Sequence, residues 1–301
     1  MLYLLLESSN TDTEKSEEYS KKQAQRGLVL FFVILIVLSI PAYWLRIRGI
    51  SPFVIIFTPA IASIITRLIL KEGFRDVSFR FRGHNLRKSY LIAYLFPMAV
   101  VLIAYGFTWI SGLAEFDFSP IKSNASIPFP ENPYLGFLIL IAIVWTAQVA
   151  VNMLFVAGEE IGWRGYMLTR LIDSGAPYPL LIHGLIWSAF HIPLILTGAY
   201  SPASGPSVAL TVVMFTIMAT SFSYLLAWLR LDSGIIWPSF VAHATSNALT
   251  QAAFNPVTQG VNSMLWIGES GIVTVIILVL LLMFVKRKYF MNHFAKGQNV
   301  Y

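Results

Sequence analysis

Three short polar clusters interrupt stretches of the chain that are otherwise apolar. They are Glu159-Glu160 with Arg164, Trp187 with His191, and His243 with Asn247. Ionisable side chains at membrane depth cost several kcal/mol and are usually functional. The three clusters are therefore candidates for a single chemical site.

The first cluster contains two adjacent carboxylates and a guanidinium. Glu160 and Arg164 are four residues apart, so on a helix they share a face and can pair. Glu159 lies about 100° around the helix from Glu160. One carboxylate can therefore be neutralised by the arginine while the other points into a cavity. The alternative is a surface salt bridge at a cytosolic helix end.

The other two clusters repeat the four-residue spacing. The Trp187 ring can pack over the His191 imidazole. His243 and Asn247 can both donate hydrogen bonds toward one point. The alternatives are a lone interfacial histidine and an interhelical polar clamp, which is common in membrane bundles. His183 lies two helical turns before His191 but nearer the membrane surface, and it is the weaker candidate.

The expected depth of the clusters connects them. A rise of ~1.5 Å per residue, counted from the cytosolic helix ends, places Glu159 about 16 Å deep, His191 about 20 Å and His243 about 18 Å. Polar groups from three helices then meet at one level. Unrelated structural accidents would not be expected to match in depth.

The chemistry that fits these residues is peptide-bond hydrolysis. A carboxylate such as Glu159 beside a neutral His191 can hold and deprotonate a water. A histidine and an asparagine one helical turn apart, His243 and Asn247, can stabilise an oxyanion. Alternatively, Glu159, His191 and His243 could ligate Zn²⁺, with bound water as the nucleophile. Asn247 is a poor zinc ligand and slightly favours metal-free catalysis, but both mechanisms stay open.

The composition indicates a membrane protein. Of 301 residues, 56% are hydrophobic and only 12% are charged, whereas a soluble domain has roughly 25% charged residues. The chain has no Cys, which excludes disulfides, thiolate metal sites and a cysteine nucleophile. The sequence also lacks H-E-x-x-H, G-x-S-G and G-x-G-D, the motifs of other intramembrane proteases.

Apolar segments of membrane length recur along the chain, because ~20 helical residues span a bilayer. They predict an all-α, polytopic bundle of about eight transmembrane helices. The expected spans are 27–46, 51–70, 90–111, 135–171, 179–198, 207–229, 234–254 and 265–285. We expect one transmembrane domain over 27–288, a cytosolic N-terminal tail over 1–26 and a cytosolic C-terminal tail over 289–301.

The basic residues predict the orientation of the bundle. With the N-terminal tail inside, 18 of the 21 Lys and Arg residues fall on the cytoplasmic side, as the positive-inside rule requires. Both termini are then cytoplasmic in a multi-pass protein, in the cell membrane if the source is prokaryotic. The other three are Arg46, Arg48 and Lys122, and the pair Arg46 and Arg48 is the one discordant feature. We interpret the basic loop 71–88 as a contact for lipid headgroups rather than for nucleic acid.

The order and spacing of the three clusters resemble the CPBP family, the CAAX-prenyl-endopeptidase-like and Abi-like intramembrane proteases. The resemblance covers roughly residues 135–255, and the family usually has Phe where this chain has Trp187. It implies an eight-helix fold with a conical cavity open to the cytosol. It also implies a membrane-anchored protein or peptide substrate, which in some relatives is lipidated.

The resemblance further implies a role for each polar residue. Glu159 would work with His191 on the water, while His243 and Asn247 would form the oxyanion site. Arg164 would order the two glutamates, Glu160 included. A non-enzymatic transporter or bacteriocin-immunity-type scaffold is the alternative function. Transporters often contain repeated halves, and no internal repeat is visible in this sequence.

Overall fold

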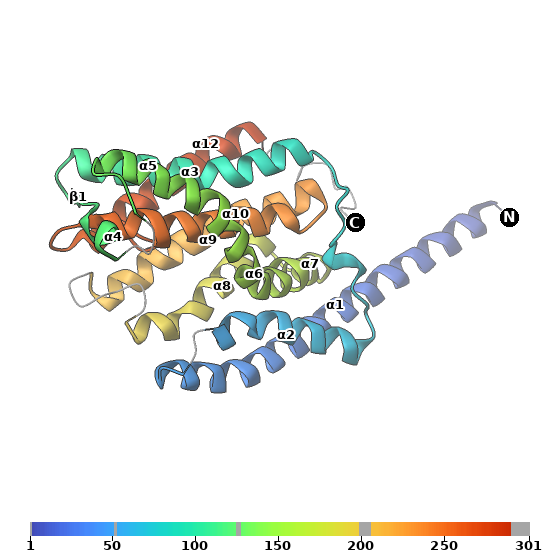
Figure 1. Cartoon of the computed structure of the whole chain (residues 1–301). Coiled ribbons are helices and arrows are strands. Elements are labelled where there is room, and N and C mark those ends of the chain that lie inside the picture. The colour runs from blue at the N-terminus through green and yellow to red at the C-terminus, as the bar shows by residue number, and fades with distance from the viewer. Residues whose placement is uncertain (1, 51–52, 125–127, 199–205, 290–301) are drawn as a thin grey trace.

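The computed structural model describes residues 2–50, 53–124, 128–198 and 206–289. These residues form a bundle of long helices, with one two-stranded antiparallel sheet in the described part of the chain (Figure 1). The long helices are α1 (Leu2–Ile47), α2 (Phe53–Leu70), α3 (Leu86–Ile110), α5 (Pro133–Ile143), α6 (Val149–Gly162), α8 (Pro179–Leu196), α9 (Val208–Ser233), α10 (Trp237–Asn247) and α12 (Ile272–Tyr289).

Short elements connect and extend these helices. The α-helical ones are α4 (Ser119–Asn124), α7 (Leu168–Asp173) and α11 (Ser263–Trp266), and the 3₁₀ turns are η1 (Arg75–Val77) and η5 (Asn255–Val257). Three π-helical turns occur among the described residues, η2 (Val144–Gln148), η3 (Trp163–Met167) and η4 (Ala248–Phe254). The sheet pairs β1 (Glu115–Phe116) with β2 (Thr258–Gln259).

The helices confirm the prediction of a polytopic helical membrane protein. Within the described residues, five helices are long and apolar enough to cross a membrane, and Val54–Leu70 and Ile272–Phe284 are shorter apolar helices. The fourth predicted span corresponds to one unbroken helix over Pro133–Asp173. This helix contains the two π turns η2 and η3. A conical cavity stays a prediction.

Two boundaries differ from the sequence prediction. Helix α1 begins at Leu2 and runs without a break into the first span, so the tail 1–26 is helical where the structure describes it. The last span begins at Ile272 instead of residue 265. Gly268 has φ +82° there, a left-handed conformation that favours glycine, and it separates α11 from α12.

The helix that carries the two glutamates is held close to α2 by glycines. A Cβ atom at Gly158 would lie 2.5 Å from the Ile56 carbonyl oxygen, and one at Gly162 would lie 2.4 Å from the Pro59 Cβ. Only a residue without a side chain allows this approach, as at other small-residue contacts between membrane helices. The contact therefore fixes how α6 is rotated, and with it the directions of Glu159 and Glu160.

An ion-pair network ties the loop after α2 to the bundle. Asp76 is bound by Arg67, which also donates to the Gly165 carbonyl at 2.8 Å, and by Arg170 at 2.9 Å. Arg230 donates to the Asp76 backbone carbonyl at 2.6 Å. Burial acts to raise the pKa of Asp76, but the hydrogen bonds and charges of the two arginines outweigh it, so this pKa lies below its ordinary value. The network therefore stabilises the loop against turn η3.

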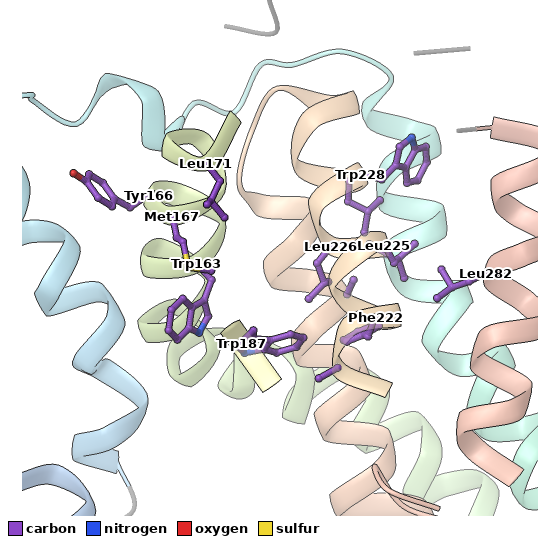
Figure 2. Packing of buried hydrophobic residues seen from close by; sticks show 14 of the residues in the cluster. Trp163, Tyr166, Met167, Leu171, Trp187, Phe222, Leu225, Leu226, Trp228 and Leu282 are labelled. Atoms are coloured by element: carbon purple, nitrogen blue, oxygen red, sulfur yellow. The ribbon is translucent and has the colours of Figure 1, made fainter. Parts of the chain in front are cut away.

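One of the hydrophobic core clusters includes residues of the α6–α7 helix, α8 and α9. Figure 2 shows Trp163 and Met167 of η3 on one side and Phe222 of α9 on the other, with Trp187 of α8 between them. Helix α10 packs against α3, α6 and α9. The elements that carry the three polar clusters, α6 with η3, α8 and α10, therefore meet in the middle of the bundle.

Candidate active site

Glu160 is the carboxylate that the structure neutralises. Its Oε1 accepts hydrogen bonds from Arg164 at 2.7 Å and from His243 Nδ1 at 2.8 Å. Glu160 and Arg164 are both 0% exposed, so the bridge lies inside the protein and is not a surface salt bridge. The predicted Glu160–Arg164 pair is present, and the contact with His243 joins α6 to α10 across the bundle.

Glu159 faces a different set of groups. Its Oε2 accepts a hydrogen bond from Trp187 Nε1 at 2.7 Å, and His191 Nε2 lies 3.9 Å from the same oxygen. Glu159 is 8% exposed and His191 is 7% exposed. The two adjacent glutamates therefore have different environments, as their helical offset predicts: Glu160 is paired with Arg164 and His243, and Glu159 faces Trp187 and His191.

The His191 ring is oriented by its own helix. Its Nδ1 lies 2.9 Å from the Trp187 backbone carbonyl. A carbonyl can only accept, so Nδ1 carries the proton in this contact, and in a neutral imidazole Nε2 is then the nitrogen with the lone pair. That lone pair is on the ring nitrogen nearer Glu159 Oε2. Phe215 packs beside the imidazole with ring centroids 5.1 Å apart.

Trp187 makes contacts that its four-residue spacing from His191 does not predict. We expected its ring to pack over His191, and the two rings do meet, edge to face, with centroids 5.9 Å apart. The indole also lies under the Arg164 guanidinium, 4.1 Å from its carbon, and donates to Glu159. The sequence signal that could have revealed this role is the Trp in place of the family's usual Phe.

His243 and Asn247 both lie on α10, one turn apart. His243 is 4% exposed, and its ring centroid is 5.4 Å from that of Trp187. Asn247 is half-buried at the last residue of α10, and its side chain forms no hydrogen bond within the described part of the chain. The structure thus brings His243 to the glutamates, whereas the role of Asn247 stays a prediction.

His183 has a structural environment. Its Nδ1 lies 2.7 Å from Ser223 Oγ and its Nε2 lies 3.2 Å from the Trp163 carbonyl oxygen. Both ring nitrogens are therefore occupied, and the ring is fully buried between α8, α9 and η3. These contacts are consistent with the prediction that His183 is a weaker candidate for the chemical site than His191.

The zinc alternative has a test in the ligand geometry. Among the residues that the structure describes, no three His, Asp or Glu side chains are grouped as a metal site. His243 Nδ1 is bound to Glu160 and His191 Nδ1 to a carbonyl. Metal-ligating histidines make the same contacts through the ring nitrogen that does not bind the metal, so the zinc mechanism and the metal-free mechanism both stay predictions.

A π turn follows directly after the glutamates. Turn η3 begins at Trp163 and contains Arg164, and the Trp163 N–H contacts the carbonyls of both Glu159 and Glu160. π-Helical turns occur mostly as single turns inside α-helices, often at functional sites. The π turn therefore supports a functional site at this point of the long helix.

The fold and the buried polar cluster define a polytopic helical membrane protein with a carboxylate–histidine site in its interior. Residues 134–249 match the family model described as type II CAAX prenyl endopeptidase Rce1-like. The matched segment contains all three polar clusters, and this part of the chain is similar to the CAAX-prenyl-endopeptidase-like proteases of the CPBP family. The match supports a membrane protease that acts on a protein substrate. No curated protein matches the chain.

Proposed function

We propose that this protein is an intramembrane endopeptidase that hydrolyses a peptide bond with a water activated by Glu159 and His191. The observation that carries the proposal is the 3.9 Å separation of Glu159 Oε2 and His191 Nε2 at a buried position. One water at a usual hydrogen-bond distance of about 2.8 Å from both atoms can bridge them. The Rce1-like match of the segment supports the same chemistry.

The reaction begins with removal of a proton from this water. Glu159 accepts the proton, and His191 Nε2 accepts the water's second hydrogen bond, which directs the oxygen lone pair at the scissile carbonyl. Attack forms the C–O bond of a tetrahedral intermediate. When the C–N bond breaks, Glu159 returns the proton to the leaving amine, so the protein ends the cycle in its starting state.

The negative charge on the intermediate needs donors on the opposite side. His243 donates through Nδ1 to Glu160 at 2.8 Å, so a doubly protonated ring can keep its Nε2–H for the oxyanion. The Asn247 amide, one turn away on α10, supplies the second donor. An arrangement of fixed donors of this kind stabilises the transition state by more than it stabilises the substrate. Glu160 and Arg164 hold His243 in place.

We propose a membrane-anchored protein or peptide, lipidated or not, as the substrate, cut from the cytosolic side. The buried position of the site among apolar helices supports a substrate that approaches from the bilayer. The charge distribution, with 18 of 21 basic residues at one side, supports cytoplasmic termini.

A cleavage assay tests the proposal. The purified protein is incubated in lipid vesicles with membrane-anchored peptides, prenylated and unmodified, with and without a chelator. Cleavage by the wild type that is lost in Glu159→Gln is expected, and retention with the chelator would support the metal-free mechanism. If Glu159→Gln cleaves the peptides and Glu160→Gln does not, the base is Glu160. If neither change lowers a confirmed activity, the glutamate mechanism fails.

A further inference from the structure

The Trp187 side chain contacts four groups of the candidate active site. Its Nε1–H donates to Glu159 Oε2 at 2.7 Å, and the Arg164 guanidinium carbon lies 4.1 Å from the ring centroid. The His191 and His243 rings meet it edge to face, with centroids 5.9 and 5.4 Å away. Trp187 is only 4% exposed, so these contacts are made away from solvent.

The hydrogen bond to Glu159 depends on the indole. A phenylalanine at this position could fill the space beneath Arg164 and against the histidines, but its ring has no donor, whereas the indole N–H can only donate. A carboxylate in the interior of a helix bundle has no bulk water to replace a lost donor, so an unpaired oxygen there is costly. The N–H therefore restricts how the Glu159 carboxylate can rotate.

One residue holds both members of the proposed water-activating pair. Glu159 Oε2, the atom bound by the indole, is also the atom 3.9 Å from His191 Nε2. The Trp187 backbone carbonyl lies 2.9 Å from His191 Nδ1 and sets the orientation of that ring. The distance between base and histidine is therefore determined by contacts to the same residue of α8.

We propose that Trp187 is a positioning residue, which holds Glu159 through its indole N–H in the orientation that a water shared with His191 requires. The inference rests on the proposed function of Glu159 as the base. Trp187 itself transfers no proton. Its loss should lower turnover and leave substrate binding unchanged, because the contact is made to the base and not to the substrate.

A spectroscopic experiment tests the contact without any substrate. The chain has 8 Trp, so ¹⁵N-tryptophan labelling in detergent gives few indole resonances, and Trp187→Phe and Trp145→Phe assign two of them. Trp145 Nε1 is buried without a hydrogen-bond partner in the described structure, which makes it the internal reference. In Glu159→Gln the Trp187 resonance should move upfield, because an amide oxygen is a weaker acceptor than a carboxylate, while the Trp145 resonance stays.

The kinetic experiment compares two substitutions at position 187, of which the second alters fewer atoms of the side chain than the first. Trp187→Phe removes the donor and part of the ring, and benzothienylalanine at position 187 replaces only the N–H with sulfur. Both should lower kcat by about 10- to 100-fold with KM unchanged, the loss expected when a reacting group is misplaced by about 1 Å. Trp145→Phe, which deletes an indole with no hydrogen bond, should change neither constant.

The outcomes separate this inference from the proposed function. The positioning role is overturned if the Trp187 resonance does not move in Glu159→Gln. It is also overturned if the benzothienylalanine variant has the wild-type kcat. A variant whose KM rises at constant kcat also overturns it, since the ring would then contact substrate. If Glu159→Gln retains full cleavage while the Trp187 resonance moves, the proposed function fails and the positioning role falls with it, although the hydrogen bond itself stands.

Discussion

Replacing Arg164 with Ala should destabilise the protein far more than breaking an exposed ion pair of the same geometry. Arg164 and Glu160 form an i,i+4 bridge of 2.7 Å with both side chains 0% exposed. Removing the arginine strands a buried carboxylate, a change that costs about 3–5 kcal/mol. His243 still donates to Glu160 at 2.8 Å, which places the expected loss of unfolding free energy nearer the lower value, about 3 kcal/mol.

The chain contains a matched control. Lys22 and Glu18 form another i,i+4 bridge of 2.7 Å, with side chains 70% and 64% exposed. Because exposed helix pairs are screened by water and contribute little, Lys22→Ala should change the unfolding free energy far less than Arg164→Ala. The two bridges have the same spacing and length, so burial is the variable that the comparison isolates.

The assay is denaturant unfolding of the two variants and the wild type in the same detergent. A third variant, Arg164→Ala with Glu160→Gln, tests the cause, since a neutral amide leaves no stranded charge and should recover part of the lost stability. The reasoning is refuted if Arg164→Ala costs no more than Lys22→Ala. It is also refuted if the second substitution adds to the loss instead of reducing it.

Four other outcomes are expected. Glu159→Gln should abolish cleavage in the vesicle assay while its unfolding free energy stays within about 1 kcal/mol of the wild type, because the isosteric amide removes only the base. Asn247→Ala should lower kcat by about 10²–10³, the effect of losing one oxyanion donor; an unchanged kcat would remove it from the mechanism. Asp76, with its pKa below the ordinary value, contributes stability that is present above its unfolded-state pKa and lost as pH falls through its folded-state pKa. Melting curves recorded from pH 7 to pH 3 should therefore show a decline that Asp76→Asn lacks. Reporter fusions at Lys122 and Lys296, the latter outside the described residues, should fall on opposite sides of the membrane, and a common side would refute the topology.

The positions of the helices were predictable because hydropathy and length decide them locally. An apolar run of ~20 residues must satisfy its backbone as a helix in lipid. Within the described residues, five of the eight predicted segments fall on helices long and apolar enough to cross a membrane, and 51–70 and 265–285 contain the shorter apolar helices Val54–Leu70 and Ile272–Phe284. The segment 234–254 is divided between α10 and the π turn η4. The start of the last helix was misplaced, because the predicted segment 265–285 includes Gly268-Glu269-Ser270-Gly271, where the left-handed turn at Gly268 ends the preceding short helix. A short cluster of glycine and polar residues of this kind is a sequence signal for a loop.

Contacts within one helix were also predictable. The Glu160–Arg164 bridge and the edge contact of Trp187 with His191 follow from four-residue spacing. The offset of about 100° between successive residues predicted that Glu159 and Glu160 would have different partners. The sequence could state that one carboxylate would be neutralised, and the Arg164 spacing indicated that it is Glu160.

Contacts between helices were decided by tertiary packing. His243 reaches Glu160 across 83 residues of sequence and Trp187 reaches Glu159 across 28. Both depend on how each helix is rotated about its own axis, and for α6 that rotation is set by the close approach of Gly158 and Gly162 to α2. The amino-acid sequence by itself determined where the apolar helices and the three polar clusters lie along the chain, because residue type, spacing and hydropathy are local properties. Only the tertiary structure decided which atom faces which, because a helix carries its side chains around a full circle and the neighbouring helices select the direction.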